Sequence, residues 1–527
     1  MLNPIHKLAL ETIEMNKQAI IFAPSRASAE KTAEEISKLT QFQYPEFEKE
    51  VLKAASTPTK QCRRLSHCIR KGIAFHHAGL LAKQKELIEE EFRKGKIKII
   101  CCTPTLAAGM SLPAFRVIIT SLKRYSGSWG MDWIPVLEYM QMAGRAGRPE
   151  YESFGEAITL AKSEHEKEEI YETYVLGEPE EIYSKLAVEP VLRTYLLSLI
   201  SSGIIKDKES MQDFFSKTFW AHQFEDLKQL NLIMDKMLLL LEGWKFVRII
   251  NNENSNSNDD KNNDDKDNYE FIPASKLNHK TNNQEKELRP TLLGKRISEL
   301  YLDPLTATHL LDCLKNFNSS KNTFSLLQMI SHTLEMRPLL RIKSKEQDKI
   351  QEELVKNYER LLKPEPSAFD LEYNEFMNSI KTALFFEAWI NEKDEDYLME
   401  TCDIRPGEIR IKLEIADWLL YAGEELSKIL NYREALNELR KLRIRIKNGV
   451  KEDLLPLIKL KNIGRVRARK LINNGIKDLG GLKRMDLATL SQILGEAIAK
   501  DVKEQLGEEI KEIPEGRRVG QLSIQKF

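Results

Sequence analysis

Residues 98–105 read Lys-Ile-Ile-Cys-Cys-Thr-Pro-Thr, an apolar run that stops at polar and small residues. The same pattern occurs at residues 19–23, 72–76 and 117–120, where short β-branched runs are again followed by the start of a loop or helix. Continuous apolar runs of this length are typical of strands that are covered on both faces. Because helical stretches separate the runs, residues 1–165 are predicted to form an α/β domain with a parallel sheet.

The rest of the chain is mainly helical in its periodicity. Pro-rich residues 363–366 interrupt the helical part, and Asn448-Gly449 separates a long helix from a basic terminal module. After the α/β domain we predict a winged-helix domain at 166–303, a helical domain at 304–447, the basic module at 448–513 and a tail at 514–527.

An Asn-rich stretch interrupts the predicted winged-helix domain. Residues 251–268 hold eight Asn, six acidic residues and two Lys and no apolar side chain, so burial cannot offset the entropy of ordering them. We predict a disordered loop there that joins two strands of a hairpin, at 244–250 and 269–273. Strands that follow helices in this way indicate a winged helix.

Composition narrows the class of protein. The chain has 527 residues, enough for three or four domains, and its 80 basic residues equal its 80 acidic ones, so binding to a polyanion requires local clusters of charge. The six cysteines lack the spacing of a zinc site, and we predict reduced thiols and no metal site. No apolar run reaches the roughly 18 to 20 residues that cross a bilayer, so we expect a soluble protein without a membrane partner.

The most specific signal is Gln-Met-Ala-Gly-Arg-Ala-Gly-Arg-Pro at residues 141–149. We predict that Arg145 and Arg148, three positions apart, lie on one face of a helix and project their guanidinium groups to the same side. Such a pair suits a γ-phosphate, because an arginine that reaches across a cleft stabilises the charge that develops in phosphoryl transfer. For two isolated arginines, a solvated basic face would be the simpler interpretation.

Four ordered segments together resemble the second RecA-like domain of superfamily 2 helicases. They resemble motif IV at residues 21–26, motif IVa at 75–80, motif V at 102–114 and motif VI at 141–149, and the last two are similar to the Ski-two-like branch in particular. The resemblance implies that ATP is faced by Gln141, Arg145 and Arg148 and approached by Gly109. It implies that the nucleic-acid backbone is met by Ser25, Arg26, His77 and Thr103, small or basic donors that bind phosphates without reading bases.

Half of an ATP site is missing from the sequence. No G-x-x-x-x-G-K-[ST] motif occurs, Gly294-Lys295-Arg296 lacks both the upstream Gly and the hydroxyl, and residues 394–397 are no Asp-Glu-x-His box. The carboxylate that holds Mg²⁺ would therefore lie on a first RecA-like domain, in cis or on a separate chain. We expect this polypeptide alone not to hydrolyse ATP.

Residues 122–136 place two extended stretches around Ser126-Gly127-Ser128, which predicts a β-hairpin with an aromatic tip. In similar helicases a hairpin at this place separates the strands of a duplex. The resemblance implies that Trp129 stacks on the last base pair, whereas Trp133 fits a core position equally well.

A segment of the helical domain, from Arg405-Pro406-Gly407 to Tyr421, looks like the ratchet helix of archaeal helicases of the Holliday-junction-migration type (Hjm). There a Trp stacks on a base and an Arg about two turns earlier grips the strand, which implies DNA contacts for Trp418 and Arg410. The match is imperfect, since Ile411 stands seven residues before Trp418, and Arg410 lies about 80° around the helix from it. Packing of Trp418 inside a helical bundle is the alternative.

The terminal module carries a concentrated positive charge. Between residues 441 and 470, eleven Lys and Arg face two acidic residues, a net charge of +9, which indicates binding to nucleic acid. Residues 460–471 resemble a helix-hairpin-helix, in which backbone N–H groups at a Gly turn hold a phosphate. The candidate contacts are Gly464, Arg465, Arg467 and Arg469, although Asn462 stands where Gly is frequent and a solvated charged face is the alternative.

The last residues of the chain fit the Q-x-x-I-x-x-F start of a peptide that binds a sliding clamp, through Gln521, Ile524 and Phe527. The chain stops before the usual second aromatic residue. A structural or autoinhibitory tail is the alternative.

The resemblance as a whole implies the C-terminal portion of an ATP-dependent 3′–5′ DNA helicase for forked or stalled replication DNA in repair and recombination. Its domains would be a second RecA-like domain, a winged helix, a helical ratchet domain and a helix-hairpin-helix domain. Its partners would be single-stranded and forked DNA, in the cytoplasm at the nucleoid. An RNA helicase of the same branch and a non-catalytic DNA-binding remnant are the alternatives.

Overall fold

The computed structural model of the chain describes residues 3–507 except for 56–57, 105–111, 126–130, 149–152, 187, 225–226, 252–285 and 319–322. The chain divides into two compact units. One consists of Met1–Leu305 with Glu395–Lys412, and the other of Thr306–Asp394 with Leu413–Phe527.

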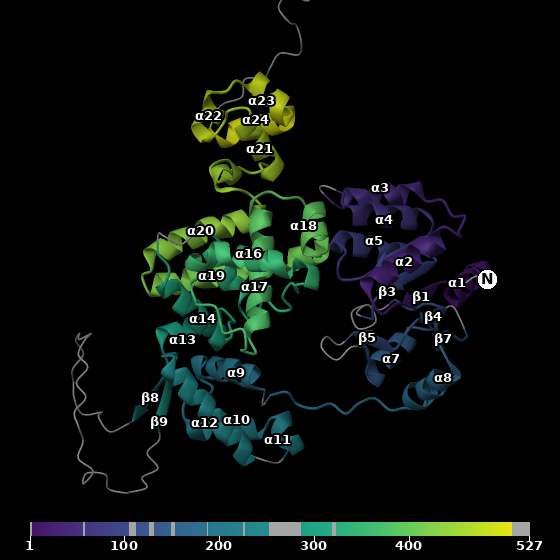
Figure 1. Cartoon of the computed structure of the whole chain (residues 1–527), viewed down its shortest axis with the longest axis horizontal. Helices are drawn as coiled ribbons and strands as arrows, with labels where there is room; N and C mark the ends of the chain where they lie inside the picture. The colour runs from purple at the N-terminus through teal and green to yellow at the C-terminus, as the bar shows by residue number, and fades with distance from the viewer. Residues whose placement is uncertain are drawn as a thin grey trace, which may run out of the picture. The chain divides into compact units, whose positions relative to one another are not determined.

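A five-stranded parallel sheet lies at the centre of the RecA-like part of the first unit (Figure 1). In the order β2-β3-β1-β4-β7 its strands are β2 (Ile73–His76), β3 (Ile99–Cys102), β1 (Ala19–Phe22), β4 (Arg116–Ile119) and β7 (Glu156–Thr159). The first four confirm the predicted α/β fold, and all their residues are buried. Strand β7 was not predicted, because its residues are partly buried or exposed and form no continuous apolar run.

Helices cover this sheet. They are α1 (Pro4–Glu14), α2 (Arg26–Ser37), α3 (Pro45–Lys53), α4 (Lys60–Arg70), α5 (Ala82–Arg93), α7 (Val136–Ala143) and α8 (Glu164–Ile170), which continues into the π-helix η2 (Tyr171–Val175). Helices α2 and α4 pack on β2, and α7 packs on β4. Tyr174 is buried in the same core and donates to the carbonyl of Ile134 at 2.6 Å. The expected boundary at residue 165 falls inside α8, and we propose to place it after Val175.

The predicted hairpin is present between β4 and α7. Strand β5 (Lys123–Tyr125) pairs antiparallel with β6 (Met131–Trp133). Trp133 packs beside Tyr174 with ring centroids 5.8 Å apart, and the Lys123 ammonium lies 3.9 Å from the Trp133 ring. Trp133 is therefore part of the support of the hairpin, whereas Trp129 lies outside the described residues.

The region predicted to form a winged helix follows in the same unit. It contains α9 (Glu189–Ser201), α10 (Lys208–Ser216), α11 (Phe219–Phe224), α12 (Leu227–Gly243), β8 (Val247–Asn251), β9 (Lys286–Pro290) and α13 (Leu292–Glu299). Strand β8 pairs antiparallel with β9, so the prediction that 269–273 is its partner is wrong. In β9, Leu288 is buried and its N–H donates to the carbonyl of Lys206 at 2.7 Å. Residues 252–268 of the predicted loop, and residues 269–273, lie outside the described residues.

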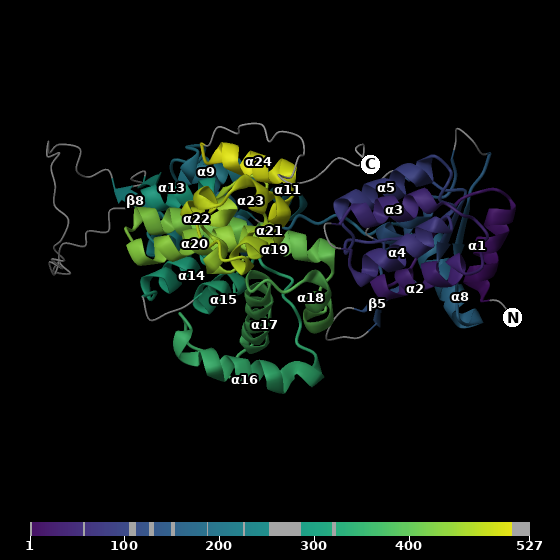
Figure 2. The same cartoon turned by 90° about the horizontal axis from the view of Figure 1, so that it is seen from above.

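Helices build the rest of the chain. They include α14 (Pro304–Lys315), α15 (Thr323–Ser331), α16 (Gln347–Asn357), α17 (Tyr373–Ile390), α18 (Glu395–Cys402), α19 (Pro406–Ile429) and α20 (Arg433–Asn448), with the short 3₁₀ helices η4 (Ser344–Glu346) and η5 (Tyr358–Arg360). Helix α17 packs on α15, α16 and α20 in the second unit, and Figure 2 shows α16 across one end of α17. The predicted break at 363–366 lies between η5 and α17.

The basic module forms a small helical core of its own in the second unit. It contains η6 (Glu452–Leu454), η7 (Leu457–Lys459), α21 (Arg465–Asn473), α22 (Leu479–Arg484), α23 (Leu487–Leu494) and α24 (Glu496–Gln505). Helix α20 ends at the predicted Asn448-Gly449 pair, where Gly449 takes the left-handed conformation with φ +61°. A Cβ at Gly449 would lie 2.8 Å from the Trp389 ring. Glycine is therefore required both by the left-handed backbone and by the lack of space for a side chain.

Candidate functional site

The candidate residues of the RecA-like domain gather at two opposite edges of its sheet. Ser25, His77 and Thr103 follow the carboxyl ends of β1, β2 and β3. The segment that carries Arg145 and Arg148 lies at the other edge, because Ala146 forms a bridge with Ala114, two residues before β4 begins. The segment of Arg145 and Arg148, implied for ATP, is therefore separated by the length of the strands from Ser25, His77 and Thr103, implied for nucleic acid.

The two arginines do not share a helical face, and that prediction is wrong. Helix α7 ends at Ala143 with Gly144 as its C-cap, so Arg145 and Arg148 follow the helix. The N–H of Gly147 donates to the carbonyl of Ala114 at 2.7 Å, with φ +96° at Gly147. Gly147, with its positive φ, turns the chain along the sheet edge after the helix has ended.

Arg148 is held by a buried amide. Its Nη2 donates to Oε1 of Gln18, a residue that is 3% exposed, and the amide group of Gln18 donates to the carbonyls of Phe92 at 2.7 Å and Ile97 at 2.5 Å. Since both carbonyls need the NH₂ group, only the amide oxygen of Gln18 is left for the guanidinium.

The Nε of Arg148 is buried and has no hydrogen-bond partner among the described residues. An unpaired buried donor on a cation is costly unless an anion reaches it, so this group suits an anionic ligand. Lys98 directly precedes β3 at the same edge, and burial and the charge of Arg148 lower its pKa.

Gln141 and Arg145 differ in exposure. Gln141 lies on the last turn of α7 and is exposed, whereas Arg145 is half-buried. The carbonyl of Arg145 accepts from the N–H of Ala114 at 2.9 Å, which anchors the backbone that carries both arginines. Gly109 lies outside the described residues.

Three of the four residues implied for nucleic acid line one pocket of about 570 Å³ at the carboxyl edge of the sheet. The lining is Pro24, Ser25, Arg26, Ala27, Ala78, Thr103, Pro104, Ser121, Lys123, Arg124, Ile134, Glu138, Asp403 and Arg405. Four basic side chains against two acidic ones, together with three hydroxyls, make this a surface for an anion such as a phosphate. Ser25 also caps α2, its Oγ accepting from the N–H of Ser28 at 3.2 Å.

Acidic side chains already meet two of the pocket's arginines. Arg124 pairs with Glu138 at 2.8 Å, and Arg26 pairs with Glu408 from the first turn of α19. These side chains are 21–53% exposed, so the pairs are partly screened by water.

His77 is the exception among the implied residues, because its side chain is fully buried. Its Nδ1 accepts from the N–H of Gly79 at 3.1 Å, and its Nε2 lies 3.1 Å from Oε1 of Glu30, which also accepts from Gln61 at 2.7 Å. A buried ring with both nitrogens engaged cannot touch a nucleic-acid backbone. His77 instead holds the loop after β2 in place, a structural role that the sequence analysis did not foresee.

The candidate residues of α19 lie in different environments. Arg410 is exposed and pairs with Glu395 at 3.2 Å in the first unit. In the second unit, Trp418 is half-buried, and its neighbour Asp417 accepts from Nε of Arg443 at 2.8 Å. Part of Trp418 therefore remains exposed to solvent.

The turn of the helix-hairpin-helix is tight despite its asparagine. Asn462 takes φ +63°, a conformation that asparagine adopts more readily than most residues, and its side-chain amide donates to Asp501 at 2.9 Å. Gly464 is exposed and is the N-cap of α21, so the first N–H groups of the helix follow it. Arg467 is exposed and donates to the carbonyl of Asn462 at 2.8 Å.

Two of the other arginines of this module make internal contacts. Arg469 donates to Glu392 and Asp453, each at 2.8 Å, and these hydrogen bonds raise its pKa. Arg465 donates to the carbonyl of Lys393 at 3.1 Å and lies 5.5 Å from the ring of Trp389. With its fork engaged by two carboxylates, Arg469 joins the module to the end of α17, a role different from the expected DNA contact.

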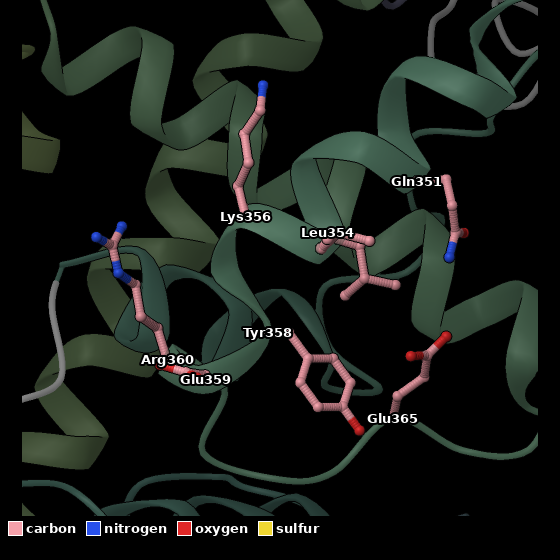
Figure 3. Close-up of a pocket in the computed structure, with 8 residues that line it drawn as sticks. Gln351, Leu354, Lys356, Tyr358, Glu359, Arg360 and Glu365 are labelled. Atoms are coloured by element: carbon pink, nitrogen blue, oxygen red, sulfur yellow. The ribbon is translucent and has the colours of Figure 1, made fainter.

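Another cavity, which lies in the second unit, is lined by none of the candidate residues. It measures about 430 Å³ and lies between η5, the end of α16 and the following loop (Figure 3). Two basic residues, Lys356 and Arg360, and two acidic residues, Glu359 and Glu365, line it, so its charge is balanced. It offers no concentrated charge for a polyanion.

Gln18, Glu30 and Glu408 were not predicted from the sequence. Each acts through a partner far along the chain, so no local pattern marks it. The only signal was for Glu408: the sequence Arg405-Pro406-Gly407-Glu408 is typical of a helix start, but it does not indicate which residue Glu408 contacts.

The fold and these sites define the second RecA-like domain of a superfamily 2 helicase, followed by helical DNA-binding regions. Family comparisons agree: residues 2–150 match the helicase conserved C-terminal domain, 324–449 the archaeal helicase domain 4, and 454–508 the SAM-like helix-hairpin-helix tandem.

Curated relatives extend the likeness along the whole chain. The ATP-dependent DNA helicase Hel308 of Pyrococcus horikoshii is 35% identical over 528 residues, which cover 98% of this chain and 68% of that protein. The proteins of the same name from Methanococcus vannielii and Methanocella arvoryzae are each 34% identical, covering 96% and 97% of this chain and 68% and 65% of theirs. The chain belongs to the Hel308 family of ATP-dependent DNA helicases. No helix among the described residues is long and apolar enough to cross a membrane.

Proposed function

We propose that this chain is the C-terminal portion of a 3′–5′ DNA helicase that unwinds forked or stalled replication DNA in repair and recombination. A first RecA-like domain, in cis or on a separate chain, would complete the ATP site and supply the carboxylate that holds Mg²⁺. The observation that supports this most is the separation of the candidate residues to opposite edges of one sheet. A rigid sheet can transmit a movement of the segment of Arg145 and Arg148 to the pocket at the opposite end of the strands.

The other regions have proposed roles in holding the DNA. The β5–β6 hairpin would split the fork, and Trp418 and Arg410 on α19 would retain the tracking strand in a ratchet domain. Gly464, Arg465 and Arg467 would bind phosphates through the N-terminus of α21, where backbone N–H groups point outward. A sliding clamp that binds Gln521, Ile524 and Phe527, and a location at the nucleoid, complete the proposal.

The role of the pocket is tested by Arg26→Ala in this chain. Loss of one phosphate contact is expected to weaken binding of a fluorescein-labelled oligothymidylate about fivefold at low salt. The slope of log K against log salt is expected to flatten by about 0.7, the value for one phosphate on a single strand. Fluorescence anisotropy at several salt concentrations measures both quantities.

The control is Arg93→Ala, which removes the same charge from an exposed site on α5 outside the pocket. Equal affinities and slopes for the two variants would refute the role of the pocket.

The polarity and substrate are tested with the first RecA-like domain supplied. DNA forks with a 3′ tail are expected to be unwound much faster than forks with a 5′ tail, because a motor that tracks one strand has one direction. Matched RNA forks are expected to stay paired. Faster unwinding of RNA than of DNA would favour the RNA helicase, and absence of ATP hydrolysis would favour a non-catalytic DNA-binding protein.

A further inference from the structure

The first turn of α19 brings a carboxylate to the nucleic-acid pocket. Oε1 of Glu408 pairs with Nη1 of Arg26, and Oε2 accepts from the N–H of Arg405 at 3.0 Å. The second bond is the one that a glutamate three residues into a helix makes to the start of that helix. Glu408 therefore joins the beginning of α19 to a pocket arginine.

Close backbone contacts keep Glu408 in this place. The N–H of Gly407 donates to the carbonyl of Gly79 at 3.0 Å, and a Cβ at Gly407 would lie 2.3 Å from the carbonyl oxygen of Ala78. On the other side, a Cβ at Gly79 would lie 2.8 Å from Cβ of Arg405. The two glycines let the segments touch, so the position of the carboxylate does not depend on the ion pair alone.

The pair joins groups that water still reaches. The side chain of Arg26 is 40% exposed and that of Glu408 is 28% exposed. A pair of this kind is weak, because water and salt screen it. A phosphate diester makes the same charge-assisted hydrogen bonds to a guanidinium as a carboxylate does, so it can take the carboxylate's place.

We infer that Glu408 occupies on Arg26 the place of a nucleic-acid phosphate and competes with the strand for that arginine. The inference rests on the proposed function of the pocket and adds a residue that positions Arg26. Each phosphate that reaches Arg26 must displace Glu408 or share the guanidinium with it. The competition therefore weakens the contact between Arg26 and a phosphate and lets the phosphate leave readily, as a motor that steps along a strand requires.

The test compares two variants with the same change in net charge. Glu408→Gln removes the competing charge and keeps an oxygen that can accept the Arg405 N–H, because Gln serves as well as Glu in this helix position. Glu400→Gln is the matched control, since Glu400 belongs to the same segment and pairs with Lys60 at the surface, outside the pocket. In this chain, Glu408→Gln is expected to bind oligothymidylate about threefold more tightly than Glu400→Gln. Equal or weaker binding by Glu408→Gln would overturn the inference.

A second measurement separates this inference from the proposed function. In an Arg26→Ala background, the gain from Glu408→Gln is expected to disappear, because the two residues act on each other. A gain that persists without Arg26 would show that Glu408 acts by general repulsion and would overturn the inference. If Arg26→Ala alone leaves DNA binding unchanged, the proposed pocket fails. If Arg26→Ala weakens binding but Glu408→Gln equals Glu400→Gln, only the competition fails.

Discussion

Replacing Arg148 with alanine is expected to lower the rate of ATP hydrolysis of the complete enzyme by about a thousandfold. The guanidinium would stabilise charge on the transferred phosphoryl group, and its buried Nε has no other partner among the described residues. DNA binding is expected to stay within about twofold, because the pocket lies at the opposite edge of the sheet. Steady-state ATPase rates with saturating DNA, and anisotropy with the same DNA, measure the two effects.

Two further variants test whether the effect requires the guanidinium group and is specific to position 148. Arg148→Lys keeps the charge but loses the planar fork that meets Gln18, so it is expected to recover little activity. Arg93→Ala removes an exposed arginine of the same domain and is expected to hydrolyse ATP at the normal rate. An unchanged turnover number in Arg148→Ala would remove the proposed role of this arginine.

Glu30→Ala is expected to destabilise the RecA-like domain by about 3 to 5 kcal/mol. The side chain of Glu30 is 1% exposed, it accepts from Gln61 at 2.7 Å, and it pairs with His77 and Arg64. Removing the carboxylate leaves buried His77 and Gln61 without this partner, which costs more than the pair itself contributes, whereas Arg64 keeps Glu34. Hydrogen exchange of the β1 and β2 amides in urea measures the loss in the intact chain.

The control for this prediction is Glu86→Ala, an exposed position on α5 where a change of less than about 0.5 kcal/mol is expected. Glu30→Gln keeps hydrogen bonding but not the charge and is expected to fall between the two. A loss for Glu30→Ala no greater than that for Glu86→Ala would contradict the structural role of the cluster.

The contribution of Glu30 depends on pH in a defined direction. Burial alone would raise the pKa, but hydrogen bonds from His77 and Gln61 and the charge of Arg64 lower it from 4.5 to about 2. A carboxyl whose pKa is lower in the folded state stabilises the fold above its unfolded pKa. The difference in stability between the unmodified chain and Glu30→Ala is therefore expected to be full above pH 4.5 and to shrink as the pH falls toward 2.

Much of the fold could be predicted because its signals are local. The four central strands are apolar runs, the β5–β6 hairpin follows from its small central residues, and α20 ends at the Asn448-Gly449 pair as expected. Strand β7 and the true partner of β8 could not be predicted, since their side chains are largely polar or exposed and pairing is a contact between distant segments.

The candidate sites, too, could be predicted only in part. The motifs identified the residue types that meet a phosphate, and Ser25, Arg26 and Thr103 do line one pocket. They could not tell that His77 is buried against Glu30 or that Arg469 is engaged by Glu392 and Asp453. A motif states which side chains are present, whereas burial and pairing depend on the surroundings that the fold supplies.

The sequence by itself determined the helicase class and most of the secondary structure, because the spacing of apolar residues, the turn residues and the order of the motifs are local features of the sequence. Only the tertiary structure decided that Arg148 meets Gln18, 130 positions away, and that Glu408 meets Arg26. Such pairs form when the sheet and the glycine contacts bring distant backbones together. Their geometry is a property of the packed chain, which no local stretch encodes.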